Sequence, residues 1–359
     1  MKRVFNHADP CIDMKINVDK HNPVTAFYLT NLCYEKNREL PFPVTKDPNT
    51  WESWRKELRE RLANILTLDK LGEPPNPVYE IIEEEKVYNY TRRKIAYETL
   101  KGNWAIAYLL IPDEITKPVP AVLSVHGHFR GGSKSVVFPD QAPGKAIAHE
   151  FAIRGIAAFA PENAGMASPT EVGTCERDVP ASYAQGQRMG GCNLLFRRLN
   201  HLGLDISGFR IFELQAALNI LSNMAEIDSG RIGCAGISGG CWLSQLLAAL
   251  DTRIKSVILC SYFTTFAQTA WIGHCVCHHP FGIGNVCDMP DISALITPRP
   301  QFVESGSQDV DYPVEPAFSM VRQAYDLLDA GDSLGIDIFE GGHRFNAVKS
   351  VPWMIEQLK

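Results

Sequence analysis

Long apolar runs are missing from this sequence. No segment reaches the roughly 18 consecutive apolar residues needed to cross a membrane. The first 20 residues carry basic side chains with no apolar stretch behind them. We therefore expect a soluble cytoplasmic protein that does not act at a membrane.

The sequence also lacks a long basic tract and a large excess of either charge. Its 35 Lys and Arg residues stand against 41 Asp and Glu residues, which gives a net charge of −6. This balance disfavours a general electrostatic attraction to phosphate backbones. We therefore expect no nucleic-acid partner.

Internal repeats and low-complexity tracts are missing too. The ten cysteines are scattered over 359 residues and do not form the framework of a small secreted domain. We expect most of them to be buried free thiols. Because 45% of the residues are hydrophobic, the chain can bury a sizeable core.

Residues 1–77 are predicted to form a helical N-terminal extension. Its apolar residues recur at steps of three and four: Trp51, Trp54, Leu58, Leu62 and Ile65. This spacing indicates an amphipathic helix packed against a larger body, and the glycine and prolines of 72–77 end it. The sequence leaves open whether the extension covers the active-site pocket or contacts another subunit of a homo-oligomer.

Residues 78–359 are predicted to form an α/β catalytic domain. Two strand-like runs, 80–100 and 103–112, indicate an antiparallel hairpin at a sheet edge. After Pro120, short apolar runs alternate with helical segments, which is typical of a mostly parallel sheet flanked by helices. The apolar runs are 121–127, 156–162, 231–238, 256–261, 301–306 and 335–342, and the helical segments are 144–155, 210–224, 240–250 and 315–331.

Two long connections interrupt this alternation, at about 162–207 and 262–292. Connections of that length in a compact domain are usually functional. Both follow central strands, at the edge where α/β sheets bind their ligands. We expect them to be lid-like insertions.

The clearest local motif is Gly236-Ile237-Ser238-Gly239-Gly240, which lies between an apolar strand and a helix. A serine at such a turn adopts a sharp, strained conformation. Glycines two residues to either side let the strand and the helix approach each other closely. This context predicts that Ser238 is a catalytic nucleophile.

A serine nucleophile needs a base, and an acid that orients the base. Asp309 follows the apolar run 301–306 and is the candidate acid, with Asp311 in the same loop as the alternative. His343 follows the run 335–342 and is the candidate base. The chain order Ser, Asp, His is the one expected of α/β-hydrolases.

Two backbone amides are expected to stabilise the negative charge that acyl transfer builds on the carbonyl oxygen. One belongs to Gly239, directly after the nucleophile, and the other to His128, in the loop after the run 121–127. We expect the side chains of His126 and His128 to support that loop rather than to take part in catalysis.

These motifs resemble the α/β-hydrolase superfamily and, more narrowly, its dienelactone-hydrolase and acetyl-xylan-esterase branch. The resemblance covers residues 80–355 and rests on VLSVHGH (122–128), IDSGRIGCAGISGG (227–240), DISALITPRP (291–300), GSQDVDYP (306–313) and GGHRF (341–345). It implies an α/β-hydrolase fold and an enzyme that cleaves carboxylic esters, often acetyl groups on sugars, without a metal or cofactor. Dienelactone hydrolases carry cysteine at the nucleophile position, so Ser238 argues against that particular activity.

Aromatic residues cluster after the nucleophile and after the run 256–261. Because ligand pockets are mainly apolar, we expect Trp242, Tyr262 and Phe263 to line the substrate pocket.

The run His274-Cys275-Val276-Cys277-His278-His279, with Cys287 nearby, contains the residue types that bind Zn²⁺. Its spacing argues against a metal site, because a single residue separates the two cysteines and no second ligand pair follows. We therefore predict no metal and no cofactor, and retain a zinc-dependent protein as an alternative class.

The predicted function is a serine hydrolase that cleaves a small acyl ester of a carbohydrate or another small molecule. The same three residues would also serve an amide, lactone or carbon–carbon bond hydrolase. A non-catalytic binding module on the same fold is a further alternative.

Overall fold

The computed structural model describes residues 38–141, 146–166, 191–271 and 274–359. Within these residues the centre of the molecule is a nine-stranded sheet in the order β1-β2-β3-β5-β4-β6-β7-β8-β9. The strands are β1 (Tyr79–Val87), β2 (Tyr90–Leu100), β3 (Asn103–Pro112), β4 (Val119–Val125), β5 (Ala157–Pro161), β6 (Ile227–Ile237), β7 (Ile254–Cys260), β8 (Gln301–Gly306) and β9 (Leu334–Phe339).

The sheet has an antiparallel part and a parallel part. In the antiparallel part, β1 pairs with β2, β2 with β3, and β3 with β5. β4 pairs parallel with β5 and β6, and the parallel pairing continues through β7 and β8 to β9. The mostly parallel sheet predicted from the apolar runs is confirmed.

The predicted antiparallel hairpin is formed by β2 and β3, but it is not the edge of the sheet, because the run 80–100 forms two strands rather than one and β1 lies outside β2. The chain reverses at Tyr88 and Asn89, where Tyr88 has a positive φ of 55°. The run holds no Gly or Pro that would mark this turn. Its acidic first half then pairs with its basic second half, and Glu84 and Glu85 form ion pairs with Arg93 and Arg92. Charged side chains along an exposed edge strand disfavour pairing with another chain.

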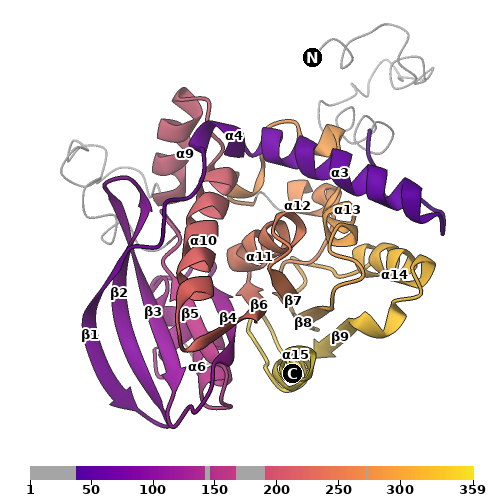
Figure 1. Cartoon of the computed structure of the whole chain (residues 1–359). Helices are drawn as coiled ribbons and strands as arrows, with labels where there is room; N and C mark the ends of the chain where they lie inside the picture. Colours follow the sequence, from indigo (N-terminus) through magenta and orange to yellow (C-terminus); the bar gives the residue numbers. More distant parts are fainter. Residues whose placement is uncertain (1–37, 142–145, 167–190, 272–273) are drawn as a thin grey trace, which may run out of the picture.

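Helices cover both faces of the sheet (Figure 1). The α-helices are α3 (Pro48–Ile65), α4 (Leu68–Leu71), α5 (Lys134–Val137), α6 (Ile147–Ala152), α9 (Gly191–His201), α10 (Ile206–Asn223), α11 (Gly239–Leu250), α12 (Phe266–Trp271), α13 (Met289–Ala294), α14 (Ala317–Leu327) and α15 (Ser350–Gln357). Three short 3₁₀ turns are η2 (Val276–His278), η3 (Ile283–Asn285) and η4 (Gly331–Ser333).

Two apolar cores form because successive strand side chains point to opposite faces of a sheet. Leu123 of β4 belongs to the core beneath α3, α10, α11, α13 and α14. Its neighbour Val122 belongs to the core beneath α5, α6 and α15. Figure 1 shows this division, with α3 across the top of the view and α6 and α15 near the bottom.

Helix α3 begins where the sequence provides a cap. The Asp47 side chain accepts hydrogen bonds from the backbone N–H groups of Asn49 and Thr50, and Pro48 occupies the first turn. The buried face of the helix consists of Trp51, Trp54, Leu58 and Leu62. Arg59 also donates to the carbonyl oxygens of Ala249 (3.0 Å) and Leu295 (3.2 Å). The predicted helix and its packing on the larger body are therefore confirmed.

The two long connections hold helices. The described part of 162–207 contains α9 and the start of α10, and that of 262–292 contains α12, η2, η3 and the start of α13. Residues 1–37 of the predicted extension, and 167–190 and 272–273 of the insertions, lie outside the described residues. The boundary at residue 77 and the lid role of the insertions stay predictions.

The cysteines behave as predicted in the described part of the chain. Six of them are buried and Cys275 is partly exposed, and all seven are free thiols. Cys11, Cys33 and Cys175 lie outside the described residues.

Across the described residues, no helix combines the length and the apolar character that crossing a membrane requires. The cytoplasmic location stays a prediction.

Candidate active site

Ser238 lies at the turn between β6 and α11, as the motif predicts. Its backbone angles are φ 58° and ψ −125°, a conformation that residues other than glycine rarely adopt. Its N–H donates to the carbonyl oxygen of Cys260 at the end of β7 (2.9 Å), and the residue is only 7% exposed. The turn therefore holds the serine at the carboxyl end of the central strands.

The glycines on either side of Ser238 are required by close packing. A Cβ on Gly236 would lie 2.1 Å from the carbonyl oxygen of Gly240. A Cβ on Gly240 would lie 2.1 Å from the carbonyl oxygen of Val125 in β4. Both distances are far inside van der Waals contact, so only glycine lets strand and helix approach this closely.

The predicted acid and base lie together. The Nδ1 atom of His343 is 2.8 Å from Oδ2 of Asp309. Asp309 is buried, whereas the alternative acid Asp311 is exposed. The geometry therefore favours Asp309 over Asp311 as the partner of His343.

The loops that carry Asp309 and His343 are held together through their backbones. The N–H groups of Ser307 and Gln308 each donate at 2.8 Å, to the carbonyl oxygens of Phe339 and Gly341 respectively. Gly306 at the end of β8 packs so closely that an added Cβ would lie 2.3 Å from the Gly341 oxygen. Adjacent parallel strands thus bring residues far apart in the sequence to one edge of the sheet.

The loop after β4 packs directly on the turn that carries Ser238. A Cβ on Gly127 would lie 2.8 Å from Cβ of Ser238 and 3.0 Å from the backbone nitrogen of Gly239. A Cβ on Gly239 would in turn lie 2.8 Å from Nδ1 of His128. The two residues predicted to supply the oxyanion amides, Gly239 and His128, are therefore neighbours.

His126 supports this loop, as the sequence predicts for its side chain. It is completely buried, and its Nε2 accepts a hydrogen bond from the backbone N–H of Asn163 (2.8 Å). The Asn163 side-chain amide donates to the His126 carbonyl oxygen (2.7 Å). The connection after β5 is thereby fastened to the loop after β4.

The three aromatic residues predicted to line the substrate pocket lie in the apolar core. Trp242, Tyr262 and Phe263 are at most 2% exposed. The indole N–H of Trp242 donates to Oγ of Ser207 (2.9 Å). Their contact with a substrate stays a prediction.

A series of hydrogen-bonded polar side chains near Ser238 was not predicted from the sequence. His278 is completely buried, and its Nδ1 is 2.7 Å from Nδ1 of His274. Nε2 of His274 is 2.8 Å from the hydroxyl of Tyr312. The other His278 nitrogen, Nε2, would lie 3.1 Å from a Cβ on Gly239. These hydrogen-bonded side chains thus connect the loop after β8 with Gly239, the residue that follows Ser238.

His274 and His278 are both held neutral at neutral pH. Burial and the charge of His128 lower the pKa of His274 to about 4. Burial lowers the pKa of His278 well below its usual value, and the neighbouring imidazoles of His274 and His128 disfavour its protonation further. The only sequence signal was the run of histidines and cysteines at 274–279, and its spacing does not reveal the contact with Tyr312.

One group of side chains in the described part of the chain could hold a metal ion. His128, Cys192, Cys275 and Cys277 place their ligand atoms within 4.8 Å of one another. Hydrogen bonds with Cys275 and Cys277 lower the pKa of the Cys192 thiol, against the effect of burial. Only Cys275 and Cys277 belong to the run considered in the sequence, and His128 and Cys192 join them from distant segments.

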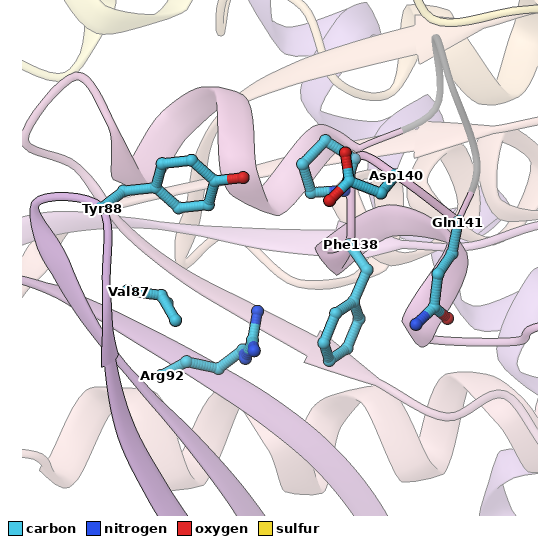
Figure 2. A pocket seen from close by; sticks show the side chains of 7 residues that line it. Val87, Tyr88, Arg92, Phe138, Asp140 and Gln141 are labelled. Atoms are coloured by element: carbon cyan, nitrogen blue, oxygen red, sulfur yellow. The ribbon is translucent and has the colours of Figure 1, made fainter.

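A separate pocket of about 330 Å³ lies between the β1–β2 turn and the segment after α5 (Figure 2). Figure 2 shows the side chains of Arg92 and Phe138 facing each other. The guanidinium carbon of Arg92 lies 4.0 Å from the centroid of the Phe138 ring. None of the residues predicted to take part in catalysis lines this pocket.

The fold and the serine turn define the chain as an α/β-hydrolase, which confirms the resemblance inferred from the motifs. Residues 32–350 match the model of the Abhydrolase family. The chain therefore belongs to this family.

Related proteins cover most of the chain. The "Putative hydrolase YtaP" of Bacillus subtilis (strain 168) is 25% identical over 271 residues, which are 73% of this chain and 83% of that protein. Among solved structures, a "putative acetyl xylan esterase" from Bacteroides fragilis NCTC 9343 superposes with a TM-score of 0.75 at 21% identity, covering 95% of this chain and 97% of that one. A glucuronoyl esterase from Solibacter usitatus gives 0.62 at 15% identity, with 88% and 94% covered. These structures share the fold.

Proposed function

We propose that this protein is a serine esterase in which Ser238, His343 and Asp309 form the catalytic triad. The observation that carries the proposal is the 2.8 Å contact between Nδ1 of His343 and Oδ2 of Asp309, at the sheet edge where the β6–α11 turn presents Ser238. A carboxylate on Nδ1 keeps the proton there, so that Nε2 carries the lone pair that acts as the base.

In the proposed reaction the Ser238 hydroxyl attacks the ester carbonyl, and Nε2 of His343 takes its proton. The amides of Gly239 and His128 donate hydrogen bonds to the resulting oxyanion. The alcohol leaves with the proton from His343, and Ser238 is left acylated. Water, deprotonated by His343, then attacks the acyl group, releases the acid and restores the serine.

The proposed substrate is a small acyl ester, with an acetylated carbohydrate as the first candidate. The names of the similar structures support this choice, since they include acetyl xylan esterases and glucuronoyl esterases. Acetyl xylan esterase 1 of Thermoanaerobacterium sp. JW/SL YS485 superposes with a TM-score of 0.57.

The first experiment measures acid release from acetylated sugars, glucuronate esters and short-chain aryl esters. Ser238→Ala is expected to lower the rate on the order of 10⁴- to 10⁶-fold. Ser256→Ala is the matched control, because this serine is buried in β7 and its hydroxyl has no hydrogen-bond partner among the described residues. Equal activity of wild type and Ser238→Ala would contradict the mechanism.

If no ester in the panel is cleaved, a fluorophosphonate probe distinguishes an enzyme whose substrate is absent from the panel from a protein that lacks a reactive serine. The probe reacts with activated serines whatever the natural substrate is, so wild type and Ser256→Ala should be labelled and Ser238→Ala should not. An unlabelled wild type would favour a binding module on the same fold.

A further inference from the structure

Four side chains of types that bind metals come together from three distant segments, and one of them, His128, lies next to Gly239. His128 lies in the loop after β4, Cys192 in the first turn of α9, and Cys275 and Cys277 at η2. We propose that these four residues bind a structural Zn²⁺ ion. The site itself does not depend on the proposed esterase reaction.

The distances between the four ligand atoms suit a tetrahedral ion. Nε2 of His128 is 3.1 Å from Sγ of Cys192 and 3.3 Å from Sγ of Cys277. The sulfur atoms of Cys275 and Cys277 are 3.3 Å apart. With Zn–S bonds of about 2.3 Å and a Zn–N bond of about 2.0 Å, a tetrahedral site has ligand separations of about 3.5–3.8 Å. The three separations above are slightly shorter than these values and the other three are at most 4.8 Å, so a change of about 1 Å or less in each pair would reach tetrahedral geometry.

The chemistry of the ligands favours zinc over other common ions. Three cysteines and one histidine are a usual set for structural zinc, whereas Mg²⁺ and Ca²⁺ require oxygen ligands. The single residue between Cys275 and Cys277 does not prevent binding, because the other two ligands come from distant segments. Sequence spacing, which argued against a metal, could not include His128 and Cys192.

A buried arginine balances the charge of such a site. Arg210 of α10 is 1% exposed, and its Nη2 lies 3.0 Å from Sγ of Cys192. Its other hydrogen bonds go to the carbonyl oxygen of Ala164, and although its charge acts on Asp205 and Glu213, neither carboxyl group forms an ion pair or a hydrogen bond with it. A buried guanidinium needs a nearby anion. Zn²⁺ with three thiolates and a neutral imidazole carries one negative charge, which Arg210 neutralises.

The ion would join both long connections to the loop that carries a predicted oxyanion amide. Cys192 belongs to the first connection, and Cys275 and Cys277 to the second. Zinc on Nε2 of His128 places the ring proton on Nδ1, the nitrogen that faces Gly239. The expected role is to hold the loop after β4 against the nucleophile turn.

The test measures zinc in the full-length protein, purified under reducing conditions without chelators from cells grown with added zinc. Wild type is expected to contain about one zinc ion per chain, and Cys192→Ser and Cys277→Ser to retain at most about a tenth of that amount. Cys287→Ala is the matched control, because this buried cysteine lies outside the cluster, and it should keep its zinc. Far-UV circular dichroism identifies variants that fail to fold.

A second measurement needs no variant. Wild type stripped of metal and titrated with Co²⁺ should develop the visible bands of tetrahedral cobalt and a thiolate charge-transfer band, and removal of zinc should lower the melting temperature. The proposal is overturned if wild type neither contains zinc nor binds added Zn²⁺ or Co²⁺. It is also overturned if mass spectrometry of wild type, purified without added oxidant, finds Cys275 and Cys277 joined in a disulfide, or if Cys287→Ala loses as much zinc as Cys192→Ser.

Discussion

Ser238 adopts a strained backbone conformation because the packing around it leaves no alternative. Strand β6 and helix α11 pack closely at the glycines on both sides of the serine, and Gly127 in the loop after β4 packs against the turn as well. A positive φ at a serine persists only where the surrounding structure imposes it. In the proposed mechanism, this conformation presents the hydroxyl group to the substrate.

Gly240→Ala tests this packing. The added Cβ would lie 2.1 Å from the backbone oxygen of Val125, which cannot move without shifting β4. We expect the free energy of unfolding to fall by about 1–3 kcal/mol or more, measured by urea denaturation. Gly131→Ala is the control, because no atom lies closer than 3.5 Å to its added Cβ, and a change within about 0.5 kcal/mol is expected. Equal stability of the two variants would contradict the close approach.

Single substitutions also test whether Asp309 or Asp311 is the acid that orients His343. Asp309→Asn removes the charge that orients His343 and is expected to lower kcat on the order of 10⁴-fold. Asp311→Asn changes an exposed carboxylate in the same loop, and its kcat should stay within about twofold of wild type. Steady-state kinetics on the best substrate of the ester panel measures both, and the reverse ranking would make Asp311 the acid.

At the scale of elements, α10 carries a buried carboxyl group whose protonation depends on folding. Glu213 is buried and accepts a hydrogen bond from the hydroxyl of Thr99 in β2 (3.3 Å). Burial raises its pKa to about 7, against the effects of Thr99 and the charge of Arg210. The folded protein therefore keeps a proton that the unfolded chain releases above pH 4.5 or so.

Because the pKa of Glu213 is higher in the folded protein than in the unfolded chain, the free energy of unfolding should fall as the pH rises. The contribution of Glu213 is fully present below about pH 4.5 and is lost as pH rises to about 7. Glu213→Gln does not titrate, so the free energy of unfolding of wild type should fall relative to the variant across this window, by about 3 kcal/mol at most. Denaturant melts between pH 4 and 8 measure the difference, and a constant difference would show that Glu213 does not titrate in this range.

Over the whole molecule, the N-terminal helix shares its core with the catalytic elements. Trp51 and Leu58 of α3 belong to the same apolar cluster as Leu243 of α11 and Tyr325 of α14. Opening α3 would expose that cluster to water, so α3 and α11 should open together.

Hydrogen exchange followed by mass spectrometry tests this coupling on the intact chain. Peptides within 51–65 are expected to exchange as slowly as peptides within 239–250, while peptides of the exposed strand β1 exchange faster. Exchange of 51–65 that is many times faster than that of 239–250 would mean that α3 opens independently of the catalytic core.

Much of the fold was predictable because its signals are local in the sequence. The apolar runs marked the parallel strands, and the step of three and four residues from Trp51 to Leu62 marked α3. The turn at Tyr88 and Asn89 was missed because Asn89 is its only usual turn former, no Gly or Pro stands beside it, and the alternation continues on both sides. The residues of the proposed triad could be nominated from their order and from the loops that carry them, whereas the polar chain through Tyr312, His274 and His278 could not.

By itself, the sequence determined the α/β class, the strained serine turn and the candidate acid and base. The class follows from the alternation of apolar runs and helical segments along the chain, and each of the other features depends on residue types within one short segment. Tertiary structure alone brought His343 against Asp309 rather than Asp311, placed Trp242 and Tyr262 in the core, and gathered the four ligands of the proposed zinc site. These arrangements depend on distances between segments far apart in the chain. The packing of strands and helices sets such distances, and no local pattern encodes them.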